Sequence, residues 1–183
     1  MRYIALLRGI NVGGKNIIKM SELRAAFHEL SFKNVGTYIN SGNVFFDSDN
    51  TDEAALKYAC EGLIADKFNL DIPVCVISAS DLHEAIAHAP PWWNNMPDAR
   101  HDTFFMIPPM TSENFLDRIG QIKEEYEKLS FHKRVVFWSA FMATFNRTRI
   151  AKTVTRDKSM YRAITIRNAN TTLKLAELTC NQF

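Results

Sequence analysis

The chain has 183 residues, of which 46% are hydrophobic and 13 are phenylalanine, enough for one compact domain or two small subdomains. This composition excludes disordered and collagen-like chains. The 22 basic and 20 acidic side chains leave a formal net charge of +2. No apolar run reaches the roughly 18–20 residues of a bilayer span, so we expect no membrane partner.

The first half of the chain alternates strand and helix patterns. In chain order we predict a strand, a helix, two strands joined by a two-residue turn at Ser41-Gly42, a second helix and a fourth strand, at residues 3–8, 20–30, 35–40, 43–47, 52–68 and 73–77. Ser21 is a candidate cap for the first helix. The resulting βαββαβ order is the ferredoxin-like arrangement, in which helices cover one face of a largely antiparallel sheet.

The second half is less regular. All six prolines lie between Pro73 and Pro109, and the residues around Trp92 and Trp93 are expected to form a long irregular connection. We predict helices at 80–88, 112–128 and 171–178, and strands at 102–107, 135–139, 142–145 and 163–167. The expected fold is therefore α+β with two subdomains, residues 1–78 and 79–183, the second being a smaller related α+β unit.

Charge is strongly segregated along the chain. Residues 1–46 carry six basic and two acidic side chains, residues 47–127 carry five and sixteen, and residues 128–183 carry eleven and two. One interpretation is that the acidic middle packs beside the basic end and neutralises it. The other is that a basic surface meets a phosphate-bearing ligand or a nucleic acid.

A glycine-rich loop follows the first strand. Residues 9–15 fit the pattern G-x-x-x-x-G-K, in which backbone N–H groups wrap a phosphate and a lysine adds charge. Three features argue against a nucleotide hydrolase. Asn16 replaces the residue that would bind Mg²⁺, the predicted helix begins about five residues after Lys15, and the βαββαβ order supplies no parallel core. An ordinary turn and a less specific anion site remain as interpretations.

Other candidate nucleophiles and metal ligands have weak patterns. Ser41 lies in a strand-to-strand turn, whereas the nucleophile elbow joins a strand to a helix, so turn chemistry explains this serine. No histidine or cysteine spacing matches a recognised zinc site, and we expect no metal and no cofactor. The three cysteines form no close pair, which indicates a reducing compartment and a cytoplasmic location; they are Cys60, Cys75 and Cys180.

Six cations fall between residues 147 and 162. If this segment is helical, Arg149, Lys152 and Arg156 share one face as a row suited to phosphates. In a solvated loop the same residues would add only solubility. Further on, Arg167 ends a strand that leads into a helix, a place where unpaired N–H groups favour an anion. Ordinary helix capping is the alternative interpretation there.

Three segments carry a family resemblance. Residues 5–16, 37–45 and 164–177 read ALLRGINVGGKN, TYINSGNVF and ITIRNANTTLKLAE. With these segments the chain resembles the bacterial family called domain of unknown function 1697 over essentially its whole length. The resemblance implies two α+β subdomains, the first ferredoxin-like, and it implies no established activity, so it assigns no catalytic residue.

The candidate ligand-binding residues come from the loop, turn and strand-end motifs and from the basic row. They are Arg8, Asn11, Gly13, Gly14, Lys15, Asn16, Ser41, Asn43, Arg149, Arg167, Asn168, Asn170 and Thr171. Our first hypothesis is that the two halves meet at a cationic cleft that binds a phosphate-containing ligand, either a nucleotide or a nucleic acid.

Two alternative functions accompany this hypothesis. One is a transferase or hydrolase that acts on a phosphorylated or nucleotide substrate, with Lys15 and Arg167 as charge clamps and His101 as the base. The other is a protein-interaction module that uses Trp92 and Trp93 as an exposed anchor. The oligomeric state does not follow from the sequence.

Overall fold

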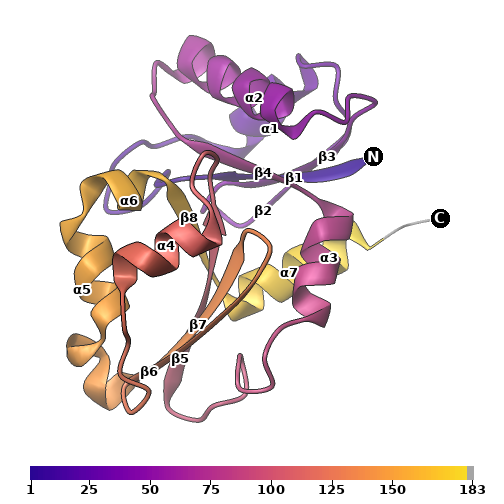
Figure 1. The fold of residues 1–183 in the computed structure, drawn as a ribbon. Coiled ribbons are helices and arrows are strands. Elements are labelled where there is room, and N and C mark those ends of the chain that lie inside the picture. Colours follow the sequence, from indigo (N-terminus) through magenta and orange to yellow (C-terminus); the bar gives the residue numbers. More distant parts are fainter. Residues whose placement is uncertain (181–183) are drawn as a thin grey trace. The chain divides into compact units, whose positions relative to one another are not determined.

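A computed structural model describes residues 1–180, and the chain divides into two compact units (Figure 1). Unit 1 comprises Met1–His83 and the chain end from Leu175, and unit 2 comprises Glu84–Lys174. Each unit contains a four-stranded antiparallel sheet with helices, which confirms the predicted α+β fold of two related subdomains. The predicted domain boundary after residue 78 stays a prediction.

Unit 1 has the predicted βαββαβ order. Its elements are β1 (Arg2–Leu7), α1 (Met20–His28), β2 (Lys33–Tyr38), β3 (Asn43–Asp47), α2 (Glu53–Phe68) and β4 (Val74–Ser78), and the chain continues into α3 (Ala79–Ala87). The strands are arranged β2-β3-β1-β4. This is the ferredoxin-like sheet, with its first strand in the interior.

The helices α1 and α2 cover one face of the unit 1 sheet with an aromatic core. The rings of Phe32 and Phe46 stack with centroids 4.0 Å apart, and Phe27 packs against both. On β2, a Cβ atom at Gly36 would come within 2.1 Å of the Phe45 ring, so the neighbouring strand requires a glycine there. The glycine-rich loop and the β2–β3 turn therefore extend from the ends of well-packed strands.

Unit 2 repeats this order of elements. It contains β5 (Ala99–Met106), α4 (Ser112–Ile119), β6 (Glu127–His132), β7 (Val135–Phe141), a 3-10 helix η1 (Met142–Arg147), α5 (Arg149–Arg156), α6 (Lys158–Arg162) and β8 (Ile164–Asn168). The helix α7 (Ala169–Thr179) follows, and its residues from Leu175 onward belong to unit 1. The strand order of unit 2, β6-β7-β5-β8, places the first, second, third and fourth strands as in unit 1. The second unit is therefore built on the same topology as the first.

Two predicted elements of unit 2 are wrong, and one strand was not predicted. The helix predicted at 112–128 ends at Ile119, because Gly120 has a φ of 68° and closes the helix through its N–H to Leu116. The chain then forms β6, a strand that the sequence patterns did not reveal. The strand predicted at 142–145 belongs to η1.

The other two differences concern turns and caps. The turn between β2 and β3 has four residues, from Ile39 to Gly42, rather than two, and both of these residues have a positive φ. The predicted cap of α1 is also wrong, since Lys19 precedes that helix and no side chain caps it. The start of α3 does have a side-chain cap, since Ser78 Oγ accepts the N–H of Asp81 at 3.0 Å.

No helix within residues 1–180 is both long and apolar enough to cross a membrane.

The three cysteines are free thiols, with Cys60 and Cys75 buried and Cys180 exposed. Burial raises the pKa of the Cys60 thiol to about 12, and the nearby Glu61 carboxylate adds to the rise. This thiol therefore stays protonated and unreactive in the folded protein.

A buried carboxylate organises the helical side of unit 2. Glu127, at the start of β6, has no solvent exposure. It accepts hydrogen bonds from Trp138 Nε1 at 2.9 Å and from the backbone N–H groups of Arg149 at 2.5 Å and Ile150 at 3.3 Å. One anion thus satisfies the indole and the first N–H groups of α5, where the helix dipole also favours negative charge.

Replacing Glu127 with alanine should lower the free energy of unfolding by about 2–4 kcal/mol, because it leaves buried N–H donors without an acceptor. The Glu125→Ala variant removes an exposed carboxylate two residues earlier and should stay within about 0.5 kcal/mol of the wild type. Urea unfolding of both variants measures the difference. Equal stabilities would contradict the role assigned to Glu127.

Candidate functional site

In unit 1 the structure joins the glycine-rich loop (residues 9–18) to the β2–β3 turn. Asn11 is the link, since its Nδ2 donates to the carbonyl oxygens of Ile18 and Asn40, each at 2.9 Å. Its Oδ1 accepts the N–H of Ile18 at 2.8 Å. The backbone of Asn11 has a φ of 55°, a conformation that asparagine tolerates better than most residues. Two of the predicted motifs are therefore neighbours in space.

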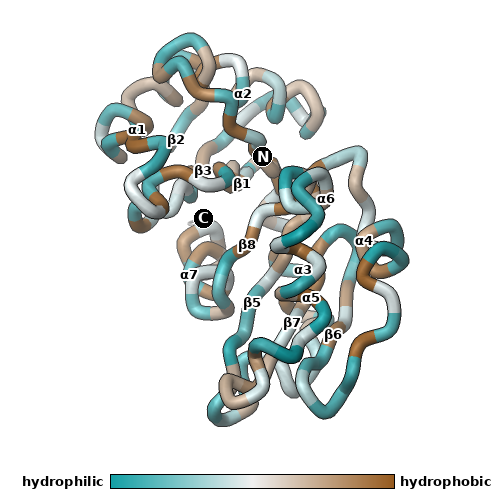
Figure 2. Tube along the Cα trace, turned by 90° about the vertical axis from the view of Figure 1, so that its left-hand side faces the viewer, coloured by the Kyte–Doolittle hydropathy of each residue, from teal (hydrophilic) through white to brown (hydrophobic). Residues whose placement is uncertain are grey.

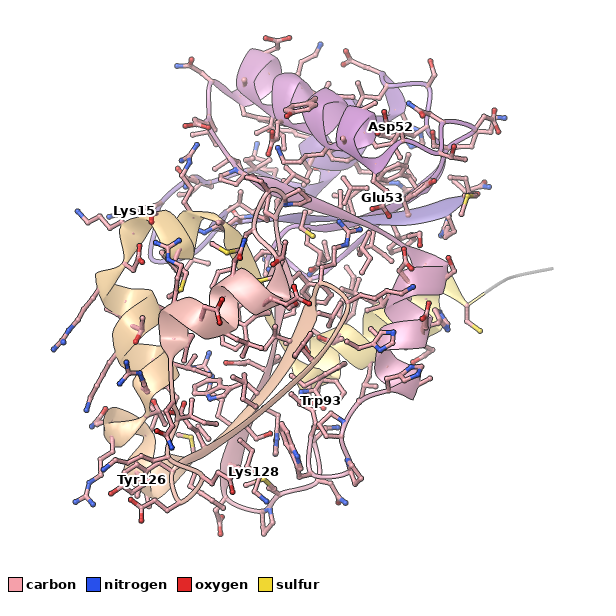
Figure 3. The ribbon with its side chains drawn as sticks, viewed as in Figure 1. Lys15, Asp52, Glu53, Trp93, Tyr126 and Lys128 are labelled. Carbon is pink, nitrogen blue, oxygen red and sulfur yellow. The ribbon has the colours of Figure 1, made fainter. Side chains whose placement is uncertain are left out.

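The remaining loop residues form a narrow hairpin. The N–H of Lys15 donates to the carbonyl of Val12 at 3.1 Å, and Asn16 Nδ2 donates to the carbonyl of Gly9 at 3.0 Å. Gly13 and Gly14 lie at the exposed tip with positive φ. The side chain of Lys15 is exposed and extends away from the ribbon (Figure 3). The helix α1 starts only at Met20, so its N-terminus does not directly follow the loop as in a phosphate-binding loop.

Ser41, Asn43 and Arg8 also support this region. Asn43 is fully buried, and its Nδ2 donates to the carbonyl of Tyr38 at 3.0 Å and to Ser41 Oγ at 3.1 Å. The N–H of Arg8 donates to the carbonyl of Pro73 at 3.0 Å. The side chains of Ser41 and Asn43 thus take part in local hydrogen bonds that hold β2 and β3 in register.

In unit 2, four predicted residues lie where β8 passes into α7. Arg167 is only 7% exposed, and its Nη1 donates to Thr165 Oγ1 at 2.9 Å and to the carbonyl of Ile166 at 2.8 Å. Asn168 Oδ1 accepts the N–H of Thr171 at 2.8 Å and so caps α7. Asn170 is exposed and Thr171 is buried. The capping interpretation is therefore realised at Asn168.

Arg149 lies on the other side of the unit 2 sheet from Arg167. Ile164 and Ile166 of β8 pack in the core beneath α4 and α5, and the alternation of the strand directs Arg167 to the opposite face. Arg149 begins α5, and its Nε donates to the carbonyl of Ile119 at the end of α4. The structure therefore does not bring these two arginines together.

The helical side of unit 2 contains a pocket of about 330 Å³. It lies between the sheet and the segment that runs from η1 through α5 to α6, and all of its lining residues belong to unit 2. Most of the lining is apolar and aromatic, from Phe104, Trp138, Phe145, Ile150, Ala151, Val154 and Ile166. A few polar groups converge on it, as in small-molecule sites; they are Arg100, Asp102, Thr155 and Tyr161.

Arg100 and Asp102 form a charged pair inside this pocket. They are two residues apart on β5 and therefore point to the same face. Arg100 Nε lies 2.6 Å from Asp102 Oδ2, with side-chain exposures of 50% and 3%. Burial raises the pKa of the Asp102 carboxyl above its ordinary value, and the Arg100 guanidinium opposes that rise. The pair places a desolvated carboxylate at the pocket wall.

The predicted cationic row does form on the helices beside this pocket. The segment around residues 149–156 is helical, as the row required, and Lys152 and Arg156 are exposed on it. Exposed cations continue on α6 at Lys158 and Arg162. Figure 2 shows hydrophilic stretches in teal at both helices. The same two helices therefore carry pocket-lining side chains and exposed positive charge.

His101, the proposed catalytic base, and Trp93, part of the proposed interaction anchor, are both engaged within the fold. His101 Nδ1 lies 2.6 Å from Ser139 Oγ and accepts the N–H of Asn94 at 3.1 Å, while Nε2 lies 3.1 Å from the carbonyl of Met96. Both ring nitrogens are thus engaged. Trp93 is 6% exposed, so the expectation of an exposed anchor is wrong for this residue. Residues 1–180 contain no cluster of metal-ligating side chains.

The sequence reasoning missed Arg100, Asp102, Thr155 and Tyr161. A usable signal was present for the first two, because an arginine and an aspartate lie two residues apart in the polar first half of β5, ahead of the apolar Phe104–Met106. At this spacing the two opposite charges lie on one face of the strand and can pair. Thr155 and Tyr161 had no such signal, since their helices pack over the sheet only in the tertiary structure.

Replacing Asn11 with alanine should destabilise unit 1 by about 1–3 kcal/mol, because three hydrogen bonds are lost and alanine disfavours the positive φ. Asn40→Ala is the matched control, since only the backbone carbonyl of Asn40 takes part in the link. Thermal unfolding and amide exchange at Ile18 measure the effect. Unchanged protection of the Ile18 amide in Asn11→Ala would refute the link.

Asp102 should leave a pH signature. Its folded-state pKa is raised, so its stabilising contribution is complete below the ordinary aspartate pKa and is lost as the pH rises through the raised value. Relative to Asp102→Asn, the wild type should therefore lose stability as the pH increases from acid towards neutrality. Melting curves for wild type, Asp102→Asn and the exposed control Asp117→Asn test this. Parallel curves for all three proteins would rule out the raised pKa.

Comparisons with known proteins agree with the fold. The family model "Protein of unknown function (DUF1697)" matches residues 1–137. The solved structure of the conserved bacterial protein SP0830 from Streptococcus pneumoniae is similar, with a TM-score of 0.86 and 32% sequence identity over 97% of this chain and 98% of that chain. No curated protein has a matching sequence. The family model and the structural neighbour together show that the chain belongs to the family Protein of unknown function (DUF1697).

Proposed function

We propose that the protein binds a small phosphate-bearing ligand of the nucleotide type, with its ring in the pocket of unit 2. The observation that carries the proposal is the combination of this pocket with exposed cations on the two helices, α5 and α6, that help to form it. An apolar lining with a few convergent polar groups suits a flat ring, and lysine and arginine side chains suit a phosphate.

The charge balance of the helices supports an anionic ligand. Between residues 147 and 162 the only acidic residue is Asp157. Its carboxylate is already committed, because it caps α6 through the N–H of Met160 at 3.0 Å and pairs with Arg118 at 2.5 Å. Neither Lys152 nor Arg156 forms an ion pair within residues 1–180. These two cations therefore have charge available for a phosphate.

The pocket favours a small ligand over a nucleic acid as the first partner to test. A concave site of about 330 Å³ encloses a ring, whereas a nucleic acid backbone needs an extended positive track. The predicted positions of unit 1, including Lys15 in the exposed loop, lie outside this pocket and stay separate predictions. A short oligonucleotide in the same assay tests the nucleic-acid alternative.

Binding should appear as stabilisation in a thermal-shift screen with nucleoside monophosphates, pyrophosphate and a short oligonucleotide. A ligand at about 100 times its dissociation constant adds roughly 2.7 kcal/mol to the free energy of unfolding. Charge reversal at Lys152 and Arg156 together should weaken nucleotide binding at least tenfold, since two phosphate contacts are replaced by repulsion.

The control for this experiment is Lys33→Glu, which makes the same kind of charge change at an exposed site in unit 1. It should leave binding unchanged. A screen without any shift, or an equal loss in the helix variant and in Lys33→Glu, would refute the proposed site.

A further inference from the structure

Asp102 presents one carboxylate oxygen to the pocket without a partner. Its Oδ2 accepts from Arg100 Nε at 2.6 Å, whereas Oδ1 accepts no hydrogen bond from any residue in the range 1–180. The side chain is 3% exposed and lines the pocket. A buried carboxylate normally has hydrogen-bond donors for both oxygens. Oδ1 is not a fully buried unsatisfied atom, so a donor that enters the pocket can reach it.

The rest of the lining does not supply that donor. Trp138 is the cross-strand neighbour of Asp102, but its Nε1 donates to Glu127. The hydroxyl of Thr155 donates to the carbonyl of Ala151 at 2.6 Å. The other walls nearest the sheet are the rings and aliphatic groups of Phe104, Phe145, Ile150, Val154 and Ile166. A ligand that enters this pocket meets apolar surfaces, the polar side chains of Arg100, Thr155 and Tyr161, and one carboxylate acceptor.

Arg100 fixes the geometry of that acceptor. The guanidinium lies over the Phe145 ring, with its carbon 5.6 Å from the ring centroid, and Nε holds Asp102 Oδ2. An ionised carboxylate has about four acceptor positions, so one or more remain at each oxygen after this contact. Two adjacent donors on the edge of a flat ring match such a carboxylate, because both of its oxygens accept in one plane.

We propose that Asp102 selects a ring whose edge carries two adjacent N–H donors, the edge presented by guanine. This inference rests on the proposed function and names the ligand class for the same pocket. Guanine offers a ring N–H next to an exocyclic amino group, and hypoxanthine keeps only the ring N–H. Adenine presents a ring nitrogen with a lone pair beside its amino group, which opposes the carboxylate.

The proposal predicts an order of affinities measured by calorimetry with the wild-type protein. GMP should bind at least about tenfold more tightly than IMP and AMP, because a site built to accept a ligand N–H rejects analogues that lack it. Guanosine without a phosphate should keep the preference over inosine and adenosine. The comparison of the three nucleosides separates recognition of the ring from attraction of the phosphate to the helices.

Asp102→Asn tests the residue itself. The amide keeps the shape of the side chain but exchanges one acceptor oxygen for a donor, so the preference for GMP over AMP should disappear or reverse. The Asp117→Asn control alters an exposed carboxylate on α4 and should keep the wild-type order. If Asp102→Asn does not fold, the order of GMP, IMP and AMP on the wild type still decides the question.

The outcomes distinguish the two proposals. Equal affinities for GMP, IMP and AMP, with retained dependence on Lys152 and Arg156, would overturn the role of Asp102 and leave phosphate-ligand binding intact. Preference for AMP over GMP would do the same. No binding by any nucleotide or by pyrophosphate would overturn both. A preference for GMP that is unchanged in Asp102→Asn would assign the selectivity to another residue and would overturn the inference.

Discussion

The carboxylate of Glu127 is the constraint on which the helical side of unit 2 depends. It is fully buried, and it joins β6, the Trp138 indole on β7 and the first N–H groups of α5. Because Trp138 and Ile150 both line the pocket, this one anion fixes two walls of the site relative to each other. A neutral apolar residue could fill the space but could not satisfy the donors that converge there.

The two units use one topology for different purposes. Both have a first strand in the interior of a 2-3-1-4 sheet, followed by helices that cover the face on which the aromatic core lies. In unit 1 the helices pack closely on the sheet, and the rings of Phe32 and Phe46 stack between them. In unit 2 the single long helix of this position is replaced by η1, α5 and α6, and these shorter segments leave a pocket over Asp102.

Much of the fold follows from local patterns. The elements of unit 1 are predicted within a few residues, because their apolar periodicities are regular and their ends carry turn residues such as Gly42. The wrongly predicted helices and strands lie in unit 2, whereas unit 1 differs only in the length of one turn and the cap of one helix. Gly120 ends α4, although the amphipathic pattern of the sequence continues beyond it. The strand β6 shows no clear alternation of apolar and polar residues, because its first buried residue is a glutamate. A charged residue at a core position gives no apolar signal to a pattern-based prediction.

The sequence by itself determined the α+β class, the order of elements in unit 1, the family and the cationic segment between residues 147 and 162. It also selected Asn11 and Asn168, although as ligand contacts, whereas both side chains hold local structure through hydrogen bonds. Only the tertiary structure decided that Arg149 and Arg167 lie on opposite faces of a sheet and that Arg100 and Asp102 line a pocket. Those facts depend on strand pairing and on which helices pack over the sheet, and such contacts between distant residues leave no periodic trace in the chain.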